Sequence, residues 1–362
     1  MSQRFWRVSG VGVGVMVPLL ALMMCRGALG AAATSATDGT PYVEPPPGNV
    51  DAPEEVTFPE DDGPHDASIE WWYYTGHLFT DDGVRYGFEQ VVFKGAPNGV
   101  AGFASHAAIT DSGRDRFVYG QRVSGPGALQ SGPGFNVVMG DWVMRGVNGE
   151  DRLRMSVPGY QMAIELSAVK PPTLHDGDGF IDYGGGQASY YYSRTRMAVQ
   201  GILVVEGEPR EVHGEAWMDH QWGDFETFDE GGWDWFSVQL TDGTDLMLYV
   251  IRAADGTPVI LDGSLVSPEG ELTILDGPDF TVTTTATWTS EATGTTYPTR
   301  WKIELSEHDL ELSLTPSVAA QELDTRATTG VIYWEGEVTV EGIQDGQEVE
   351  GLGYVELTGY GS

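Results

Sequence analysis

The 362-residue sequence contains a single cysteine, Cys25, and only three lysines. Because Cys25 lies in an N-terminal stretch that we expect to be removed, the mature protein would have no disulfide and no cysteine nucleophile or metal ligand. The 19 basic residues are outnumbered by 54 acidic ones, which gives a formal net charge of −35 at pH 7. Binding of nucleic acid phosphates requires positive charge, so this excess argues against a nucleic-acid partner.

Several catalytic and cofactor motifs are also missing. The sequence has no Gly-x-Ser-x-Gly nucleophile motif, which leaves a serine hydrolase without support. It has no phosphate-binding glycine loop in the part expected to fold, and we expect no cofactor. A metal site at His213, Asp219 and His220 is not expected either. Alternation along a strand places His220 on the face opposite to the other two residues.

The N-terminus predicts export from the cytoplasm. Two arginines precede an uncharged stretch over residues 8–24, and small residues follow it as a signal peptidase requires. The stretch is short for a membrane span and contains Pro18, so we interpret residues 1–30 as a cleaved signal peptide. The mature protein would then be secreted or periplasmic, without an integral membrane span. Residues 31–58, rich in Ala, Thr and Pro, predict a disordered leader.

The rest of the chain predicts an all-β fold. Apolar and polar residues alternate over short runs, separated by turn dipeptides of the type Asp-Gly or Asn-Gly. These dipeptides stand at residues 82–83, 98–99, 148–149, 242–243, 255–256, 276–277 and 345–346. No long stretch has a clean helical period, so we expect helix only in short connections. Two hairpins are predicted directly, one joining 70–80 to 84–94 and one joining 236–241 to 245–252.

The length of the folded part predicts two domains. About 300 residues exceed what one hydrophobic core usually organises. We place the domains at residues 59–228 and 229–362, with the boundary in a polar stretch. Antiparallel sheets of this size commonly close into barrels, and the lumen of such a barrel can hold one small ligand.

Residues 214–225 carry the densest cluster of functional side chains, with one histidine, three carboxylates and two tryptophans. Charged groups are rarely buried without a partner, so this composition predicts a polar site surrounded by apolar surface. A similar segment, rich in aromatic residues, covers residues 70–78. We interpret the two segments as two walls of one ligand pocket.

Alternation along the strands assigns the candidate side chains to faces. Asp219 should point away from His220, its neighbour in sequence. His106 stands between two alanines on its face, which predicts open space around its ring. The ligand-binding candidates are Glu70, Trp72, Tyr74, His106, Tyr192 and Trp235.

Each candidate also has a purely structural interpretation. His220 and Asp219 are equally consistent with a hydrogen-bonded pair that only stabilises a strand end. Glu70 and Trp72 suit packing and a capped polar contact, because buried aromatic residues dominate β cores. His106 is typical of a core histidine with satisfied hydrogen bonds. The sequence leaves both interpretations open.

Six sequence segments, taken together and in order, resemble those of a known family. They are Glu70-Trp71-Trp72-Tyr73, Phe88-Glu89-Gln90, His106 to Asp111, Ala216 to Gly223, Tyr333 to Gly336 and Gly353 to Tyr360. The pattern is similar to that of the AttH-like secreted proteins, which are related to carotenoid 1,2-hydratases and kievitone hydratase. The resemblance implies two tandem lipocalin-like antiparallel β-barrels that hold an apolar ligand in or between them.

The resemblance also implies catalytic residues. Carotenoid hydratases use a histidine and a tryptophan two residues later, which match His220 and Trp222, together with a tyrosine and an aspartate on a later strand. Tyr249 matches the tyrosine, but Val250 and Ile251 follow it and no aspartate does. Asp219, which is adjacent to His220 in sequence, could substitute for the absent aspartate. The catalytic candidates are therefore His220, Trp222, Asp219 and Tyr249.

Two functions remain open at this point. In the first, the protein is a hydratase that adds water to an alkene of an isoprenoid or lipid. Such a reaction needs a buried acid, aromatic faces to stabilise a carbocation and a base that directs water. In the second, the protein is a non-catalytic carrier or chaperone for an apolar ligand and works with an export system. The absent aspartate favours the carrier, and the His220 segment favours the enzyme.

The predicted signal peptide can be tested directly. We expect the exported protein to begin close to residue 31, because cleavage follows the small residues that end the apolar stretch. N-terminal sequencing of material recovered outside the cytoplasm measures this. An intact Met1 on that material would contradict cleavage and indicate an anchor instead.

Overall fold

The structure, a computed structural model, describes residues 54–95, 101–184, 186–225 and 231–361. The predicted signal peptide, residues 31–53 of the predicted leader and the predicted boundary between residues 228 and 229 lie outside the described residues. None of the described residues belongs to a helix long and apolar enough to cross a membrane.

The first sheet has twelve strands, which are the described strands up to Asp224. Its spatial order is β4-β3-β2-β1-β12-β11-β8-β7-β6-β5, with β9 and β10 paired to β11. The strands are β1 (Ile69–Thr80), β2 (Arg85–Gly95), β3 (Gly102–Asp111), β4 (Arg116–Ser124), β5 (Phe135–Met139), β6 (Trp142–Val147), β7 (Glu150–Val157), β8 (Tyr160–Ala168), β9 (Thr173–Leu174), β10 (Phe180–Gly184), β11 (Gln187–Val205) and β12 (Glu208–Asp224). The first and last strands of this sheet in chain order, β1 and β12, pair with each other near the centre of the sheet.

The second sheet has ten strands in the order β16-β15-β14-β13-β22-β21-β19-β18-β17, with β20 paired to β21. They are β13 (Trp233–Leu240), β14 (Asp245–Arg252), β15 (Pro258–Val266), β16 (Leu272–Asp276), β17 (Thr281–Thr289), β18 (Thr296–Leu305), β19 (Leu310–Pro316), β20 (Glu322–Asp324), β21 (Ile332–Gln344) and β22 (Gln347–Leu357). The helical segments among the described residues are the short 3₁₀ turns η1 (Glu60–Asp62), η3 (Ser112–Arg114), η4 (Pro126–Ala128), η5 (His175–Gly177) and η6 (Ser306–His308).

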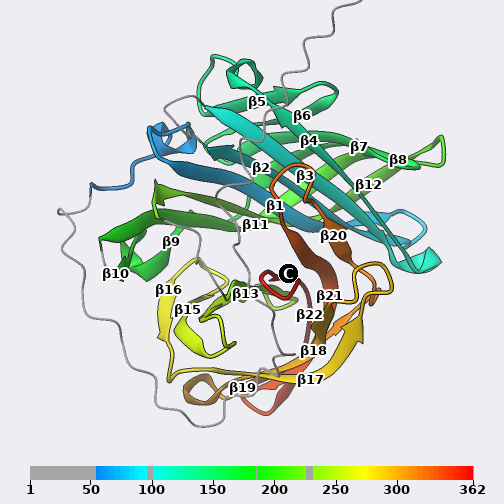
Figure 1. Ribbon diagram of the computed structural model, residues 1–362. Helices are drawn as coiled ribbons and strands as arrows, with labels where there is room; N and C mark the ends of the chain where they lie inside the picture. The colour runs from blue at the N-terminus through cyan, green and yellow to red at the C-terminus, as the bar shows by residue number, and fades with distance from the viewer. Residues whose placement is uncertain (1–53, 96–100, 185, 226–230, 362) are drawn as a thin grey trace, which may run out of the picture.

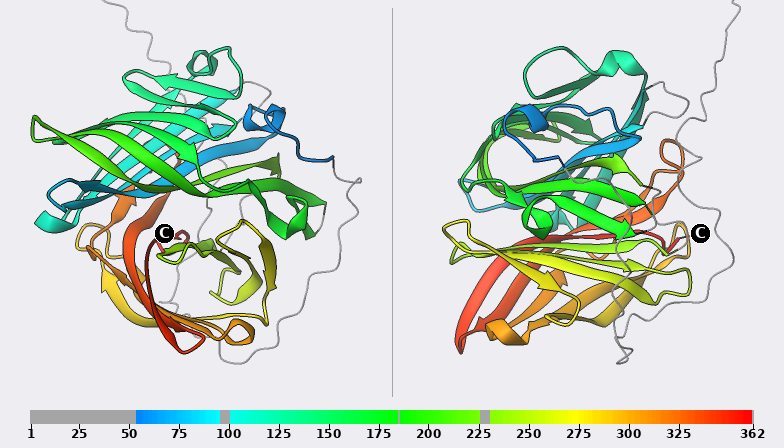
Figure 2. Two further views of the ribbon diagram at one scale, coloured as in Figure 1. Left: turned by 180° about the vertical axis from the view of Figure 1, so that it is seen from behind. Right: turned by 90° about the vertical axis from the view of Figure 1, so that its left-hand side faces the viewer.

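The all-β prediction is confirmed, and so are the two predicted hairpins. β1 and β2 are joined at Gly83, whose φ is 81°, and β13 and β14 at Gly243, whose φ is 95°. A positive φ is strained for any residue with a Cβ, which explains the Asp-Gly dipeptide at each turn. Figures 1 and 2 show the first sheet above and the second below, each strongly curved.

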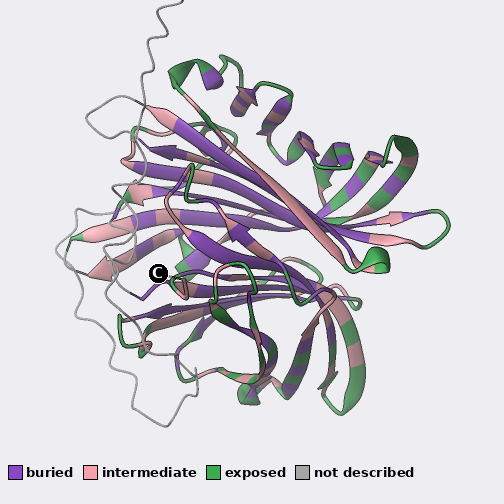
Figure 3. Ribbon diagram, turned by 45° about the vertical axis from the view of Figure 1, so that its right-hand side comes forward, coloured by how far each residue is buried: buried purple, intermediate pink, exposed green. Residues whose placement is uncertain are grey.

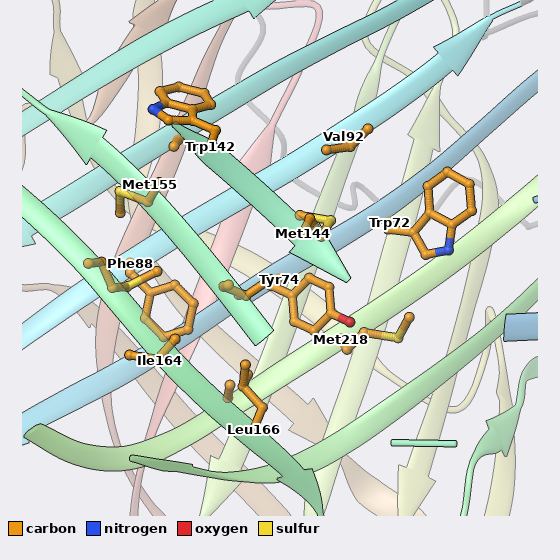
Figure 4. Close-up of a cluster of buried hydrophobic side chains, with 14 of the residues drawn as sticks. Trp72, Tyr74, Phe88, Val92, Trp142, Met144, Met155, Ile164, Leu166 and Met218 are labelled. Carbon is orange, nitrogen blue, oxygen red and sulfur yellow. The ribbon is translucent and has the colours of Figure 1, made fainter. Parts of the chain in front are cut away.

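Side chains fill the interior of the first sheet. Trp72, Tyr74 and Met218 pack there against Met144 and Phe88, as Figure 4 shows. The segment before β1 closes one end, since Val56 and Phe58 join this core. The second sheet likewise curves around buried residues such as Phe236, Trp301 and Trp334. Protein side chains thus occupy the interior of the first sheet.

A third apolar cluster lies between the two sheets and contains residues from both, among them Tyr73, Trp217, Trp235 and Tyr354. The strands that meet here are buried along most of their length, whereas strands at the outer rims alternate between buried and exposed residues (Figure 3). The central strands are therefore covered on both faces.

A buried carboxylate joins the two sheets. Asp245 of β14 accepts hydrogen bonds from Lys170 Nζ at 2.7 Å, Arg196 Nη2 at 2.7 Å and Thr195 Oγ1 at 2.8 Å. These three partners belong to the first sheet or its connections, and Asp245 is fully buried. The Arg196 guanidinium also donates to the carbonyl of Leu240 at 2.9 Å. Two cations of one domain thus share one anion of the other.

Removal of this anion should loosen the joint between the domains. We expect Asp245→Ala to lower the free energy of unfolding by about 3–5 kcal/mol, because two buried cations lose their counterion. Urea unfolding followed by tryptophan fluorescence measures the change. Glu271→Ala, at an exposed position directly before β16 of the same domain, serves as the control and should change stability by less than about 0.5 kcal/mol. Equal effects of the two substitutions would show that Asp245 does not hold the joint.

Candidate functional site

The two sheets enclose a pocket, which we call the interdomain pocket. Its volume is about 90 Å³, and aromatic side chains from both sheets form most of its surface. It is lined by Trp71, Tyr73, Glu89, Val91, Phe93, Tyr183, Tyr191, Asp219, Gln221, Phe225, Trp233, Trp235, Tyr249, Ile251, Tyr333 and Glu356. A concave apolar site with a few polar groups that converge is the usual form of a ligand or active site.

Strand register decides which side chains reach this pocket. In the β1–β12 pair, Tyr73 lies opposite Asp219, and Trp72 lies opposite His220. Residues opposite each other in an antiparallel pair share a face, and adjacent residues point to opposite faces. Tyr73 and Asp219 therefore face the pocket, whereas Trp72 and His220 face the core of the first sheet.

Asp219 is held by three donors at the floor of the pocket. Its carboxylate accepts hydrogen bonds from Tyr191 Oη at 2.7 Å, from Trp217 Nε1 at 2.6 Å and from Ser193 Oγ. Tyr191 in turn accepts a hydrogen bond from Trp235 Nε1 at 3.1 Å. Burial raises the pKa of Asp219 to about 6, although the three donors stabilise its ionised form.

Glu89 has one satisfied oxygen and one free oxygen. Tyr333 Oη donates to Glu89 Oε1 at 3.1 Å, and His106 Nδ1 lies 2.9 Å from the same hydroxyl. Glu89 Oε2 is buried and has no hydrogen-bond partner among the described residues. Burial raises the pKa of Glu89 to about 8, which favours the neutral carboxylic acid near pH 7. Burial also lowers the pKa of His106 to about 3, which keeps its ring uncharged.

Two further carboxyl groups lie beside Glu89. Tyr73 Oη donates to Glu335 Oε1 at 2.7 Å, and Trp233 Nε1 donates to Glu356 Oε2 at 2.9 Å. Burial, together with the charges of Glu356 and Glu89, raises the pKa of Glu335 well above its usual range. Burial raises the pKa of Glu356 to about 7. Ionisation of one of these carboxyl groups disfavours ionisation of the others, which keeps their pKa values raised.

Tyr249 has an acidic partner from the neighbouring strand. Tyr249 and Asp262 are opposite each other in the β14–β15 pair, and Tyr249 Oη donates to Asp262 Oδ2 at 3.1 Å. Burial raises the pKa of Asp262 to about 7. The aspartate that is absent after Tyr249 in sequence is thus present beside it in space, supplied by β15.

The other face of β1 and β12 holds a separate polar group inside the first sheet. Glu70 Oε1 lies 2.9 Å from His220 Nε2 and 2.8 Å from His65 Nδ1, and Glu70 Oε2 accepts from Lys94 Nζ at 2.9 Å. Burial opposes ionisation of Glu70, but hydrogen bonds from both histidines and the charge of Lys94 outweigh it and hold its pKa at about 2. Burial lowers the pKa of His220, and Glu70 offsets part of this shift.

With the geometry described, the chain can be compared with known proteins. Residues 49–360 match the AttH-like family. The chain belongs to the AttH-like family. A crystal structure of an AttH protein from Nitrosomonas europaea is 33% identical, covers 88% of this chain and 100% of its own, and superposes with a TM-score of 0.78. The resemblance inferred from the six sequence segments is thereby confirmed.

Two further relatives have names that state a reaction. Kievitone hydratase from Nectria haematococca has the same fold, with a TM-score of 0.69, 18% identity, and coverage of 86% of this chain and 97% of its own. A dehydratase of Emericella nidulans, asqC, is 25% identical over 224 residues. That match covers 57% of this chain and spans only 60% of the dehydratase.

In this AttH-like protein the predicted catalytic set is divided by the sheet. Asp219, Tyr249 and Trp235 line the interdomain pocket. His220 and Trp222 lie on the opposite face of β12, and the candidates that share the first core with them are Glu70, Trp72, Tyr74 and Tyr192. The prediction that His220, Trp222, Asp219 and Tyr249 form one site is therefore wrong, because adjacent residues of a strand point to opposite faces.

Two other expectations need correction. The segments 214–225 and 70–78 are not two walls of a pocket but adjacent strands of one wall, since β1 and β12 pair along their whole shared length. The open space predicted around His106 is filled, because its ring is fully buried and both nitrogens have partners, Tyr333 Oη at 2.9 Å and Thr328 Oγ1 at 3.0 Å. Tyr333 belongs to β21, and Thr328 lies in the connection between β20 and β21.

Sequence reasoning missed several residues of the pocket. Glu89, Glu356 and Tyr333 were part of the family segments but received no role, and Tyr183 and Tyr191 were not singled out. One signal was available: Glu89 and Glu356 each stand within an apolar, aromatic strand, where an unpaired carboxylate is rare. The sequence could not show that Glu89 and Glu356 lie close together, because β2 and β22 are far apart in the chain.

The raised pKa of Glu89 predicts a pH dependence of stability. The folded state keeps a proton that the unfolded chain loses above about pH 4.5, so the contribution of Glu89 is complete below that pH and is lost as the pH rises through about 8. We expect the wild type to lose stability between these pH values more steeply than Glu89→Gln.

Urea unfolding at several pH values measures this slope. Glu211→Gln, at an exposed position of β12, should keep the wild-type slope. Parallel curves for Glu89→Gln and the wild type would show that Glu89 is ionised in the folded protein.

Proposed function

We propose that this AttH-like protein is a hydro-lyase that adds water to, or removes it from, a carbon–carbon double bond in the interdomain pocket. One observation carries the proposal: buried carboxyl groups, whose pKa values burial raises, line an aromatic cavity, and one of them, Glu89, has an oxygen without a hydrogen-bond partner among the described residues. A carboxylic acid that remains neutral at pH 7 is a suitable general acid.

In the proposed reaction, Glu89 donates its proton to one alkene carbon, and the positive charge develops on the more substituted carbon. Trp235, Tyr73 and Tyr191 line the pocket. Cation–π attraction to such desolvated faces is worth about 2 kcal/mol or more, which corresponds to more than tenfold in rate.

Water completes the addition. A water molecule attacks the carbocation through its oxygen, and its surplus proton passes to an ionised carboxylate, for which Glu356 with a pKa of about 7 is suited. The product is an alcohol, and the proton returns to Glu89 through solvent. Dehydration follows the same steps in reverse, with Glu356 as acid and Glu89 as base.

The relatives support this reaction class. A hydratase shares the fold, and a dehydratase shares sequence over part of its length. Both names describe the transfer of water to or from a substrate, in opposite directions. The acids of the pocket serve either direction.

The lining of the pocket supports an uncharged, apolar substrate of isoprenoid or lipid type. Among the described residues that line it, none is lysine, arginine or histidine, and several are acids. An anionic substrate would meet repulsion there without a counterion. A volume of about 90 Å³ is smaller than the roughly 150 Å³ cavity that accommodates benzene, so the pocket as formed holds only the reacting end of a longer molecule.

A carrier without catalytic activity is the second candidate. It is favoured by the position of His220 and Trp222, which the resemblance to carotenoid hydratases marks as catalytic but which do not line the pocket. In that case the same pocket binds an apolar ligand and returns it unchanged. We propose for either function that the protein acts outside the cytoplasm, where an export system is a suitable partner for the carrier.

Turnover separates the two functions. The wild type is incubated with neutral alkenes bearing a trisubstituted double bond and with the corresponding tertiary alcohols, and products are measured by mass spectrometry as gain or loss of water. We expect Glu89→Gln and Glu356→Gln each to reduce turnover by about 10² to 10⁴, because each removes a proton-transfer group.

Glu211→Gln is the matched control and should retain activity, since its side chain is exposed. Ligand affinity is measured in parallel by tryptophan fluorescence. Tight binding with every compound recovered unchanged would reject the hydro-lyase and establish the carrier. Full turnover by Glu89→Gln would reject the assignment of Glu89 as the acid.

A further inference from the structure

Three metal-ligand atoms converge on the face of β12 that the pocket does not use. They are Nδ1 of His65, Oε1 of Glu70 and Nε2 of His220, which we call the His65–Glu70–His220 triad. Glu70 Oε1 lies 2.8 Å from the His65 nitrogen and 2.9 Å from the His220 nitrogen, and all three atoms lie within 4.8 Å of one another.

Rigid elements hold this arrangement. Glu70 of β1 and His220 of β12 belong to paired strands, in which Glu70 is opposite Trp222 and Trp72 is opposite His220. Both side chains are fully buried, and that of His65 is 19% exposed. The His65 ring stacks on Trp222 with a centroid separation of 3.8 Å and an angle of 3° between planes. The ligand atoms are therefore fixed, and one edge of the triad is accessible to solvent.

Two outer partners orient the ligands in the manner of metal sites. Asp61 Oδ1 lies 3.1 Å from Nε2 of His65, and Lys94 Nζ lies 2.9 Å from Oε2 of Glu70. A carboxylate on the second nitrogen of a ligating histidine fixes the orientation of the ring and raises its basicity. Each partner engages the atom that the metal would leave free.

The hydrogen bonds of His65 give an independent reason for a cation. Both of its ring nitrogens face carboxylate oxygens, of Glu70 and of Asp61, and a carboxylate only accepts. A cation bound to Nδ1 would lie beside Glu70 Oε1 and leave Nε2 to donate to Asp61.

We propose that the His65–Glu70–His220 triad binds one divalent first-row transition-metal ion such as Zn²⁺. Two imidazoles and one carboxylate form a donor set that such ions prefer over Mg²⁺ or Ca²⁺, which favour oxygen ligands. The ion joins the segment before β1 to the β1–β12 pair. It lies on the face of the sheet opposite to the interdomain pocket, so the proposal does not rest on the hydro-lyase.

Metal titration tests the site on the full exported protein. Protein stripped with a chelator is titrated with Zn²⁺ in excess Mg²⁺, which occupies the acidic surface of a chain with net charge −35. We expect the wild type to bind one equivalent. His65→Gln and Glu70→Gln should each lose this binding by at least 100-fold, and Asp61→Asn should weaken it by about 10- to 100-fold.

His213→Gln is the matched control, because His213 is an exposed histidine on the same strand as His220. It should bind Zn²⁺ like the wild type. Zn²⁺ should also raise the melting temperature of the wild type and of His213→Gln but not of His65→Gln, since the ion binds only the folded site.

A measurement on the wild type alone guards against variants that fail to fold. Co²⁺ bound by two imidazoles in a site of low coordination number gives visible absorption that Co²⁺ on surface carboxylates does not. Absence of this absorption, or equal Zn²⁺ binding by the wild type and His65→Gln, would overturn the proposal.

Discussion

The pairing of β1 with β12 buries both faces of the same two strands, and the rest of the molecule is arranged around this constraint. Trp72, Tyr74 and His220 enter the core of the first sheet, whereas Tyr73 and Asp219 enter the pocket between the sheets. Because successive side chains alternate, neighbours in sequence serve different sites. The backbone of β1 and β12 therefore separates the core of the first sheet from the interdomain pocket.

The pKa values of buried carboxyl groups shift in opposite directions on the two faces of β1 and β12. Glu89 and Glu356 line the pocket and Glu335 lies close to them, and burial raises the pKa values of all three. In the first sheet, Glu70 is as deeply buried, yet two histidines and Lys94 hold its pKa at about 2. Partners, rather than burial alone, decide whether a buried acid is charged. The first environment suits proton transfer, and the second suits binding of a cation.

The pocket belongs to neither domain by itself. The first sheet supplies Glu89 and Asp219, and the second supplies Tyr249, Tyr333 and Glu356. The joint that brings them together has an apolar cluster and the buried Asp245, which pairs with two cations of the first domain. This joint therefore covers the acids of both domains, and burial there raises their pKa values.

The sequence by itself determined what depends on local patterns. Alternation and the Asp-Gly dipeptides identified an all-β chain and two of its hairpins, because turn residues and period-two patterning act over a few residues. The ordered segments identified the AttH-like family, and alternation placed Asp219 and His220 on opposite faces. Only the tertiary structure decided which face meets the pocket, that Asp262 stands beside Tyr249, and that Glu89, Glu356 and Tyr333 converge. These contacts join strands separated by many residues, and no local pattern encodes the register and sheet packing that bring them together.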